Sequence, residues 1–178
     1  MRQILCYGDS NTWGYIPLTG RRYDEQNRWP GVLDDLLGEG YRVIEEGLNG
    51  RTTVFEDPLQ EGRNGKNYLL PCLLSHRPLD AVVLMLGTND MKQRYGVPAG
   101  DIARGAGVLA DIVLRSAAGP EDEAPRLLLL SPPGLGRLTA FAPMFAGAEE
   151  KSRQLSEEYM LIAVENGCSY IDVAAEVS

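Results

Sequence analysis

Short apolar runs of strand length alternate with amphipathic segments of helical length along this chain. The clearest run covers residues 81–86 and is apolar without interruption, which is typical of a strand buried on both faces of a parallel sheet. Runs of strand length occur at residues 3–7, 41–46, 81–86, 126–131 and 168–173. Between them, apolar residues at helical spacing and Pro or Gly at the ends predict helices at residues 29–37, 66–75, 98–113 and 148–165.

This alternation predicts an α/β fold, because strand–helix–strand units joined by right-handed crossovers build a parallel sheet with helices on both faces. We expect a three-layer α/β/α arrangement with a flavodoxin-like, parallel five-stranded sheet in the strand order 2-1-3-4-5. A chain of 178 residues is long enough to bury a sizeable core within one domain. Residues 1–178 are therefore predicted to form a single domain.

The charge balance argues against nucleic acid and membranes as partners. With 17 basic and 25 acidic side chains, the formal net charge is -8, which disfavours binding to polyanions and to anionic membrane surfaces. The apolar run at the N-terminus is too short for the core of a signal peptide, and no other run reaches the length of a membrane span. We expect a cytoplasmic protein that acts on a small molecule, and a homo-oligomer is left open.

The three cysteines, Cys6, Cys72 and Cys168, are widely spaced and lie in apolar surroundings. An odd number at such spacing indicates neither a disulfide framework nor a metal-binding knuckle. Buried free thiols in a reducing compartment are the simpler interpretation. No metal site is predicted.

The first three predicted strands each end in a polar loop that contains glycine. These loops hold residues 8–10 (GDS), 47–50 (GLNG) and 87–90 (GTND). Because parallel strands end at one edge of the sheet, the hydroxyl of Ser10, the backbone amide of Gly50 and the side-chain amide of Asn89 should face one crevice. Acyl transfer needs these groups, namely a nucleophile and hydrogen-bond donors for the oxyanion that forms on attack.

The three loops resemble the first three sequence blocks of the SGNH (GDSL) hydrolase family, in the right order and each after a strand. The resemblance covers residues 1 to about 135. Residues 9–14 (DSNTWG), 45–48 (EEGL), 51–53 (RTT) and 86–90 (LGTND) are most similar to the bacterial arylesterase/acyltransferase branch. The resemblance implies a serine esterase, or an acyltransferase, that acts on small acyl or aryl esters without a cofactor. By position it implies that Ser10 is the nucleophile, and that the backbone amides of Ser10 and Gly50 and the side chain of Asn89 form the oxyanion hole.

The family supplies its acid and base from an Asp-x-x-His motif near the C-terminus, and these 178 residues contain no such motif. The single histidine, His76, precedes the third strand, so a strand length of roughly 20 Å separates it from Asn89. We therefore predict a structural or surface role for His76, and Asp172 is a weak catalytic candidate. The expectation is a chain without its C-terminal segment and nearly without activity, because an unactivated serine hydroxyl is a poor nucleophile.

Other functions stay open at this point. Residues 8–12 after the first strand also resemble a phosphate loop, which would suit a phosphate- or flavin-binding module, although this explains neither Gly50 nor Asn89. A non-catalytic binding or assembly subunit is a third class. Among enzymes, a carbohydrate acetylesterase is the alternative to an arylesterase.

Several neighbouring residues carry simpler expectations. Trp13 and Tyr15 are either packing residues or walls of an acyl pocket. Asp9 and Asp90 are expected to cap their own loops or helices, and Arg51 is expected to be exposed. The apolar segment 135–145 is either a pocket lid or a subunit contact.

Overall fold

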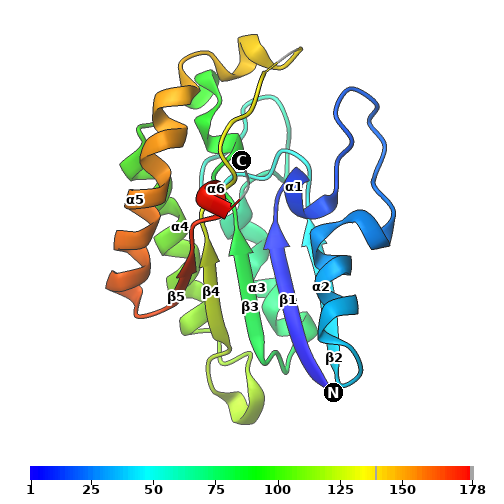
Figure 1. Ribbon diagram of the computed structural model, residues 1–178. Coiled ribbons are helices and arrows are strands. Elements are labelled where there is room, and N and C mark those ends of the chain that lie inside the picture. Colours follow the sequence, from blue (N-terminus) through cyan, green and yellow to red (C-terminus); the bar gives the residue numbers. More distant parts are fainter. Residues whose placement is uncertain (139, 177–178) are drawn as a thin grey trace.

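The computed structural model describes residues 1–138 and 140–176. At its centre lies one parallel sheet with the strand order β2-β1-β3-β4-β5 (Figure 1). Its strands are β1 (Arg2–Gly8), β2 (Tyr41–Gly47), β3 (Ala81–Met85), β4 (Arg126–Leu130) and β5 (Ser169–Ile171). Neighbouring strands all pair in parallel. The predicted fold class and strand order are confirmed.

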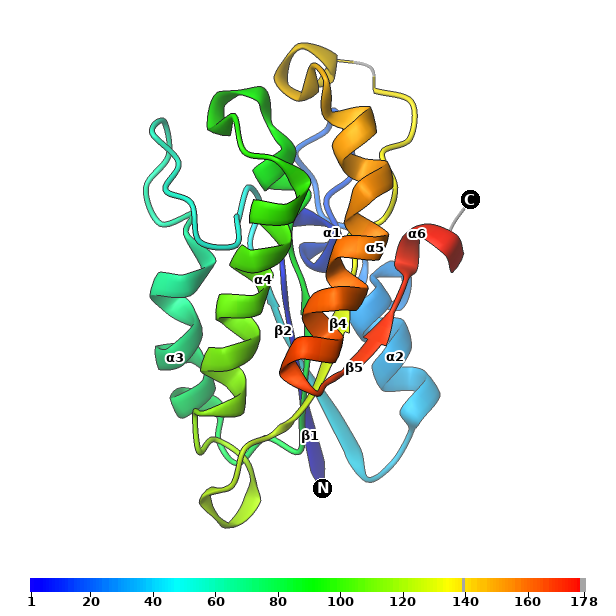
Figure 2. The same ribbon diagram turned by 90° about the vertical axis from the view of Figure 1, so that its left-hand side faces the viewer.

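Helices cover both faces of this sheet (Figures 1 and 2). One face packs against α3 (Gly65–His76), α4 (Ala99–Leu114) and α5 (Ala148–Asn166). The opposite face packs against α2 (Trp29–Leu37) and the short α6 (Val173–Glu176). A single turn, α1 (Ser10–Trp13), follows β1 at the edge of the sheet. The three-layer arrangement is therefore confirmed.

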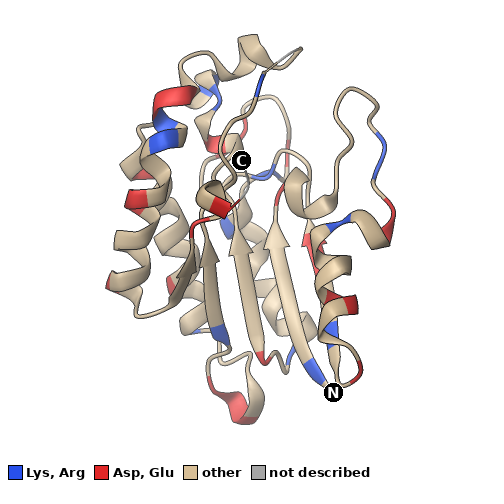
Figure 3. Ribbon diagram, in the orientation of Figure 1, with Lys and Arg blue, Asp and Glu red and all other residues tan. Residues whose placement is uncertain are grey.

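The residues of β3 divide between two apolar cores. Val82 and Leu84 belong to the larger core under α3, α4 and α5, whereas Val83 and Met85 belong to the smaller core on the side of α2. Successive side chains of a strand point to opposite faces, so β3 is buried on both sides, as its sequence predicts. Figure 3 shows no charged residue on β3, in agreement with its apolar sequence.

The boundaries of the predicted strands and helices agree with the structure to within two residues. Two helices were not predicted, α1 and α6, because four residues are too few to display a helical repeat of apolar side chains. The connecting segments also contain the 3-10 turns η1 (Glu25–Asn27), η2 (Asn89–Met91), η3 (Gln93–Tyr95), η4 (Pro120–Asp122) and η5 (Ala142–Phe145). Ser10 is therefore the first residue of a helix rather than part of a loop, which corrects the expectation from the sequence.

The strand register brings the three glycine-containing segments to one level. Gly8 pairs with Gly47 on one side and with Met85 on the other. The segments that follow β1, β2 and β3 therefore begin side by side at the C-terminal edge of the sheet, where open α/β sheets bind their ligands.

Candidate active site

Helix α1 lies directly on the ends of β1 and β2 because both strands end in glycine. A Cβ atom at Gly8 would lie 2.0 Å from the Thr12 hydroxyl oxygen, and one at Gly47 would lie 2.3 Å from the Trp13 backbone nitrogen. Only glycine allows so close an approach. The two missing side chains thus let α1 start immediately after β1, with Ser10 as its first residue.

The carboxylate of Asp9 caps this helix. Its Oδ1 atom accepts a hydrogen bond from the backbone N–H of Asn11 at 2.9 Å, as predicted. Asp9 is 1% exposed, and this burial raises the pKa of its carboxyl to about 6, against the lowering effect of the Asn11 hydrogen bond. The cap fixes the backbone on both sides of Ser10.

Ser10, Gly50 and Asn89 line one cavity of about 480 Å³. They follow β1, β2 and β3 respectively, so the convergence expected from the sequence is present. The other polar residues that line the cavity are Asn11, Asn49, Gln60, Arg63, Thr88 and Lys92. Its aromatic and apolar lining consists of Tyr15, Pro17, Leu135, Leu138, Phe141, Met144 and Phe145.

The apolar part of the lining comes mainly from the segment that follows β4. Of the two roles expected for this segment, contact with the cavity is present, and a subunit contact stays a prediction. Tyr15 also lines the cavity, and its ring centre lies 6.5 Å from that of Phe141. Trp13 does not line the cavity. Its ring makes a cation–π contact with Arg22, whose central guanidinium carbon lies 5.2 Å from the Trp13 ring centre. Tyr15 is therefore a wall residue and Trp13 a packing residue.

The side-chain amide of Asn89 makes one short and one long hydrogen-bond contact within the protein. Its Nδ2 atom donates to the backbone carbonyl of Arg51 at 3.0 Å. The carboxylate of Asp9, at 3.5 Å from Nδ2, is too distant for a strong second hydrogen bond. Asn89 is 5% exposed and lines the cavity, so its side chain is held in place at the cavity wall.

Arg51 is buried, and the expectation that it is exposed was wrong. The side chain is 3% exposed, and its Nη1 atom donates to the carbonyl of Gly8 at 2.9 Å and to the carbonyl of Glu46. Its central guanidinium carbon lies 4.1 Å from the ring centre of Tyr7, which is a cation–π contact. Arg51 therefore ties the ends of β1 and β2 together beneath the cavity.

Asp90 does not cap its own loop, which corrects a second expectation. It is fully buried and accepts hydrogen bonds from the backbone N–H of Thr53 at 2.9 Å and from the Thr53 hydroxyl at 2.5 Å. The contact joins the segment after β3 to the segment after β2. Burial raises the pKa of Asp90 to about 6, and the nearby carboxylate of Asp9 acts in the same direction.

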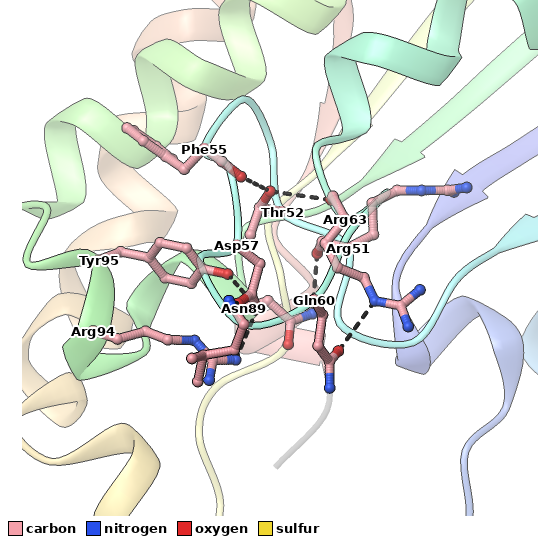
Figure 4. A network of polar contacts seen from close by, with 10 residues as sticks. Arg51, Thr52, Phe55, Asp57, Gln60, Arg63, Asn89, Arg94 and Tyr95 are labelled. Carbon is pink, nitrogen blue, oxygen red and sulfur yellow. Dashed lines mark hydrogen bonds and ion pairs between the residues drawn. The ribbon is translucent and has the colours of Figure 1, made fainter.

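A buried carboxylate holds the segment 54–65 against the short turn η3. Asp57 accepts hydrogen bonds from Arg94 at 2.9 Å and from the Tyr95 hydroxyl at 2.8 Å, as Figure 4 shows. Farther along the same segment, Arg63 donates to Gln60 at 3.1 Å, and both residues line the cavity. No sequence pattern predicts this contact, because Asp57 and Arg94 are far apart in the chain and neither belongs to a repeating pattern.

Two further polar groups of the cavity were also missed from the sequence. The side-chain oxygen of Asn49 is buried and has no hydrogen-bond partner among the described residues. Lys92 is only 7% exposed, and burial, together with the charge of Arg94, lowers the pKa of its ammonium group. The cavity thus offers a free acceptor and a cation to the polar part of a ligand.

Comparison with known proteins identifies the family of this chain. Residues 6–178 match the sequence profile of the GDSL-like lipase/acylhydrolase family. The chain belongs to this family. It is therefore a hydrolase of the ester-cleaving class, and the alternative of a phosphate- or flavin-binding module is left without support.

Solved structures of GDSL-family proteins are closely similar. The carbohydrate acetylesterase Est24 from Sinorhizobium meliloti has a TM-score of 0.95 at 40% sequence identity, over 98% of this chain and 85% of that chain. The aryl esterase of M. smegmatis has a TM-score of 0.94 at 40% identity, with the same two coverages of 98% and 85%. Another carbohydrate acetylesterase family member from Sinorhizobium meliloti has a TM-score of 0.91 at 42% identity, over 98% of this chain and 84% of that chain. A search of curated protein sequences finds no match.

The histidine and the last aspartate of this GDSL-family chain lie apart from Ser10. His76 ends α3, and its Nε2 atom is 2.9 Å from a carboxylate oxygen of Glu46. Asp172 accepts hydrogen bonds from the hydroxyls of Ser131 at 2.9 Å and Ser156 at 2.8 Å. Neither residue lines the cavity of Ser10, which agrees with the structural role expected for His76.

The helices of residues 1–138 and 140–176 include none with the length and apolar character needed to cross a membrane.

Proposed function

We propose that this protein is a serine esterase in which Ser10 forms the acyl-enzyme. The observation that carries the proposal is that Ser10, Gly50 and Asn89, from three separate strand ends, line one cavity. The family assignment supports the class of reaction, since GDSL-like proteins are lipases and acylhydrolases. No metal or cofactor enters the proposed reaction.

In the proposed reaction the Ser10 hydroxyl oxygen attacks the carbonyl carbon of the ester while its proton passes to a base. The carbonyl oxygen becomes negatively charged and accepts hydrogen bonds from the backbone N–H groups of Ser10 and Gly50 and from the Asn89 amide. The intermediate then collapses, the alcohol leaves with a proton, and Ser10 retains the acyl group. Water attacks this ester in the same way and releases the acid.

The lining of the cavity favours small substrates with an apolar or aromatic part. A volume of about 480 Å³ lies at the lower end of the range for small-molecule sites. The apolar residues after β4 suit an aryl or short alkyl group, and one of the similar structures is an aryl esterase. We therefore propose small aryl and acyl esters as the first substrate class.

Acetylated carbohydrates are the second candidate, and a separate observation favours them. The unpaired oxygen of Asn49 and the side chains of Gln60 and Lys92 provide hydrogen-bonding groups that an aryl ester would not use. Two similar structures are carbohydrate acetylesterases. Comparing p-nitrophenyl acetate with an acetylated monosaccharide, at equal concentration, would rank the two classes by kcat/KM.

A protein of these 178 residues alone is expected to react slowly, because its one histidine is bound to Glu46 outside the cavity. Exogenous imidazole can serve as the missing base, and the experiment is therefore p-nitrophenyl acetate hydrolysis over a series of imidazole concentrations. Ser10→Ala measures the reaction of imidazole itself. We expect a rate above this background that rises with imidazole and depends on Ser10.

Equal rates for the wild type and Ser10→Ala at every imidazole concentration would refute the role of Ser10. Brisk hydrolysis without imidazole, on protein confirmed by mass to end at Ser178, would refute the expectation of a missing base. Transfer of the acyl group to an alcohol, a cytoplasmic location and a homo-oligomer remain predictions.

A further inference from the structure

Three potential metal ligands meet on the face of the sheet that carries α3. Glu46 lies on β2, and Cys72 and His76 lie four residues apart on α3, hence on the same side of that helix. A carboxylate oxygen of Glu46, the Cys72 sulfur and a ring nitrogen of His76 all lie within 4.8 Å of one another. His76 Nε2 and Glu46 Oε1 are 2.9 Å apart.

We propose that Glu46, Cys72 and His76 bind a divalent metal ion of the zinc class. Thiolate, imidazole and carboxylate are the three side-chain ligands that zinc takes in proteins. A tetrahedral zinc ion would hold a nitrogen and an oxygen ligand about 3.3 Å apart, given metal–ligand bonds of about 2.0 Å. The present spacing of His76 and Glu46 therefore requires a shift of only a few tenths of an ångström.

The cluster of Glu46, Cys72 and His76 is partly open to solvent, so an ion could enter it and keep a water molecule as a ligand. The side chains of His76 and Glu46 are 32% and 19% exposed, whereas Cys72 is fully buried. An ion would therefore sit at the surface with the thiolate beneath it and its fourth coordination position open to solvent. A single helix supplies two ligands at positions i and i+4, an arrangement that places both side chains on one metal ion.

The charges of the bound state balance. When the ion binds, the Cys72 thiol releases its proton to solvent, and the neutral imidazole of His76 binds through the lone pair of one ring nitrogen while the other carries the hydrogen. The thiolate and the Glu46 carboxylate then carry two negative charges against the two positive charges of the ion. The guanidinium of Arg51, which lies beside this cluster, is held against Tyr7 and by the carbonyls of Gly8 and Glu46.

This site is separate from the proposed esterase site, since none of its three residues lines the Ser10 cavity. Its effect would be structural, because the ion would join α3 to β2. Glu46 immediately precedes Gly47, on which α1 rests, so the ion would also stabilise the edge of the sheet that carries Ser10.

The test is direct metal binding to protein without an affinity tag. Cobalt(II) is titrated while the visible absorption and the thiolate-to-metal charge-transfer band are recorded, and zinc is titrated by calorimetry. We expect one ion per chain and a charge-transfer band, which requires the Cys72 sulfur. His76→Gln and Cys72→Ala should each weaken binding at least about 100-fold, because loss of even an outer-shell partner costs 10–100-fold.

Cys168→Ser is the matched control, since Cys168 is a half-buried cysteine outside the cluster, and it should bind like the wild type. Zinc should also raise the thermal unfolding midpoint of the wild type and of Cys168→Ser, but not of His76→Gln.

If Cys72→Ala does not fold, His76→Gln and Glu46→Gln decide the question, because the side chains of His76 and Glu46 are partly exposed. Equal metal affinity of the wild type and these variants would overturn the proposal and leave a simple His76–Glu46 ion pair beside a buried thiol. Ser10→Ala should bind zinc normally, so failure of the esterase proposal would not affect this one.

Discussion

At the scale of single residues, Asn89 is the proposed side-chain donor of the oxyanion hole, and it is buried and held in place. One N–H is fixed by the Arg51 carbonyl, and the other has only a distant carboxylate within reach. Such a donor is already in place before an oxyanion forms, so no reorganisation is needed at the moment of reaction.

Asn89→Ala should therefore lower the Ser10-dependent, imidazole-assisted hydrolysis of p-nitrophenyl acetate by about 10²–10³-fold, the usual effect of losing one oxyanion-hole donor. Asn11→Ala is the matched control, because Asn11 is an asparagine of the same cavity that is exposed and is not a proposed donor. We expect its rate to stay within a few-fold of the wild type. Equal losses in both variants would argue against a specific role for Asn89.

The buried carboxylate of Asp90 should make stability depend on pH in an unusual direction. Its pKa is raised from 3.8 to about 6 in the folded protein, so between these values the folded state holds a proton that the unfolded state has lost. Stability from this group is therefore present below about pH 4 and lost as pH rises through 6.

Asp90→Asn removes this ionisation but keeps an oxygen that can accept from Thr53. Relative to the wild type, its free energy of unfolding should rise by about 1–3 kcal/mol between pH 4 and pH 7, because one pKa unit corresponds to about 1.4 kcal/mol. Urea unfolding at a series of pH values measures this difference. A difference that stays constant with pH would contradict the assignment.

At the scale of elements, the strand ends and α1 act as one unit. Helix α1 has only four residues and would not form by itself; it is held by the ends of β1 and β2 and by the Asp9 cap. The position of Ser10 therefore depends on two residues that never touch a substrate, Gly8 and Gly47.

Gly47→Ala should displace α1, because the new Cβ would lie 2.3 Å from the Trp13 backbone nitrogen, and backbone cannot rotate away as a side chain can. We expect a loss of about 1–3 kcal/mol in the free energy of unfolding, together with loss of the Ser10-dependent reaction. Gly100→Ala in α4 is the control, since its Cβ would meet nothing closer than 3.5 Å and alanine favours helix. A Gly47→Ala protein with wild-type rates would show that α1 does not need this contact.

At the scale of the whole molecule, the three cysteines differ in how far the two apolar cores bury them. Cys6 lies in the smaller core and Cys72 in the larger, and both are fully buried, whereas Cys168 is half-buried after α5. Burial raises the pKa of the Cys6 and Cys72 thiols to about 12, so thiolate is scarce at both positions.

A thiol reagent should therefore modify Cys168 first in the native protein without added metal. Cys6 and Cys72 should react only when the protein unfolds, because a buried protonated thiol is a poor nucleophile. Peptide mass spectrometry at successive times, with and without urea, measures the three rates. Fast native labelling of Cys6 would mean that the smaller core opens far more readily than its packing indicates.

The sequence determined the strands, the long helices and their order, because burial imposes a repeat of two on strands and of 3.6 on helices that can be read along the chain. It also determined that Ser10, Gly50 and Asn89 follow adjacent strands, since chain order and parallel pairing fix which ends are neighbours. The partners of the polar residues, in contrast, become known only from the folded structure. Arg51 is buried under the carbonyls of two strands, Asp90 binds Thr53 of another segment, and His76 meets Glu46. Such contacts join residues whose separation along the chain follows no period, so they arise only when the folded backbone brings the groups within hydrogen-bond distance.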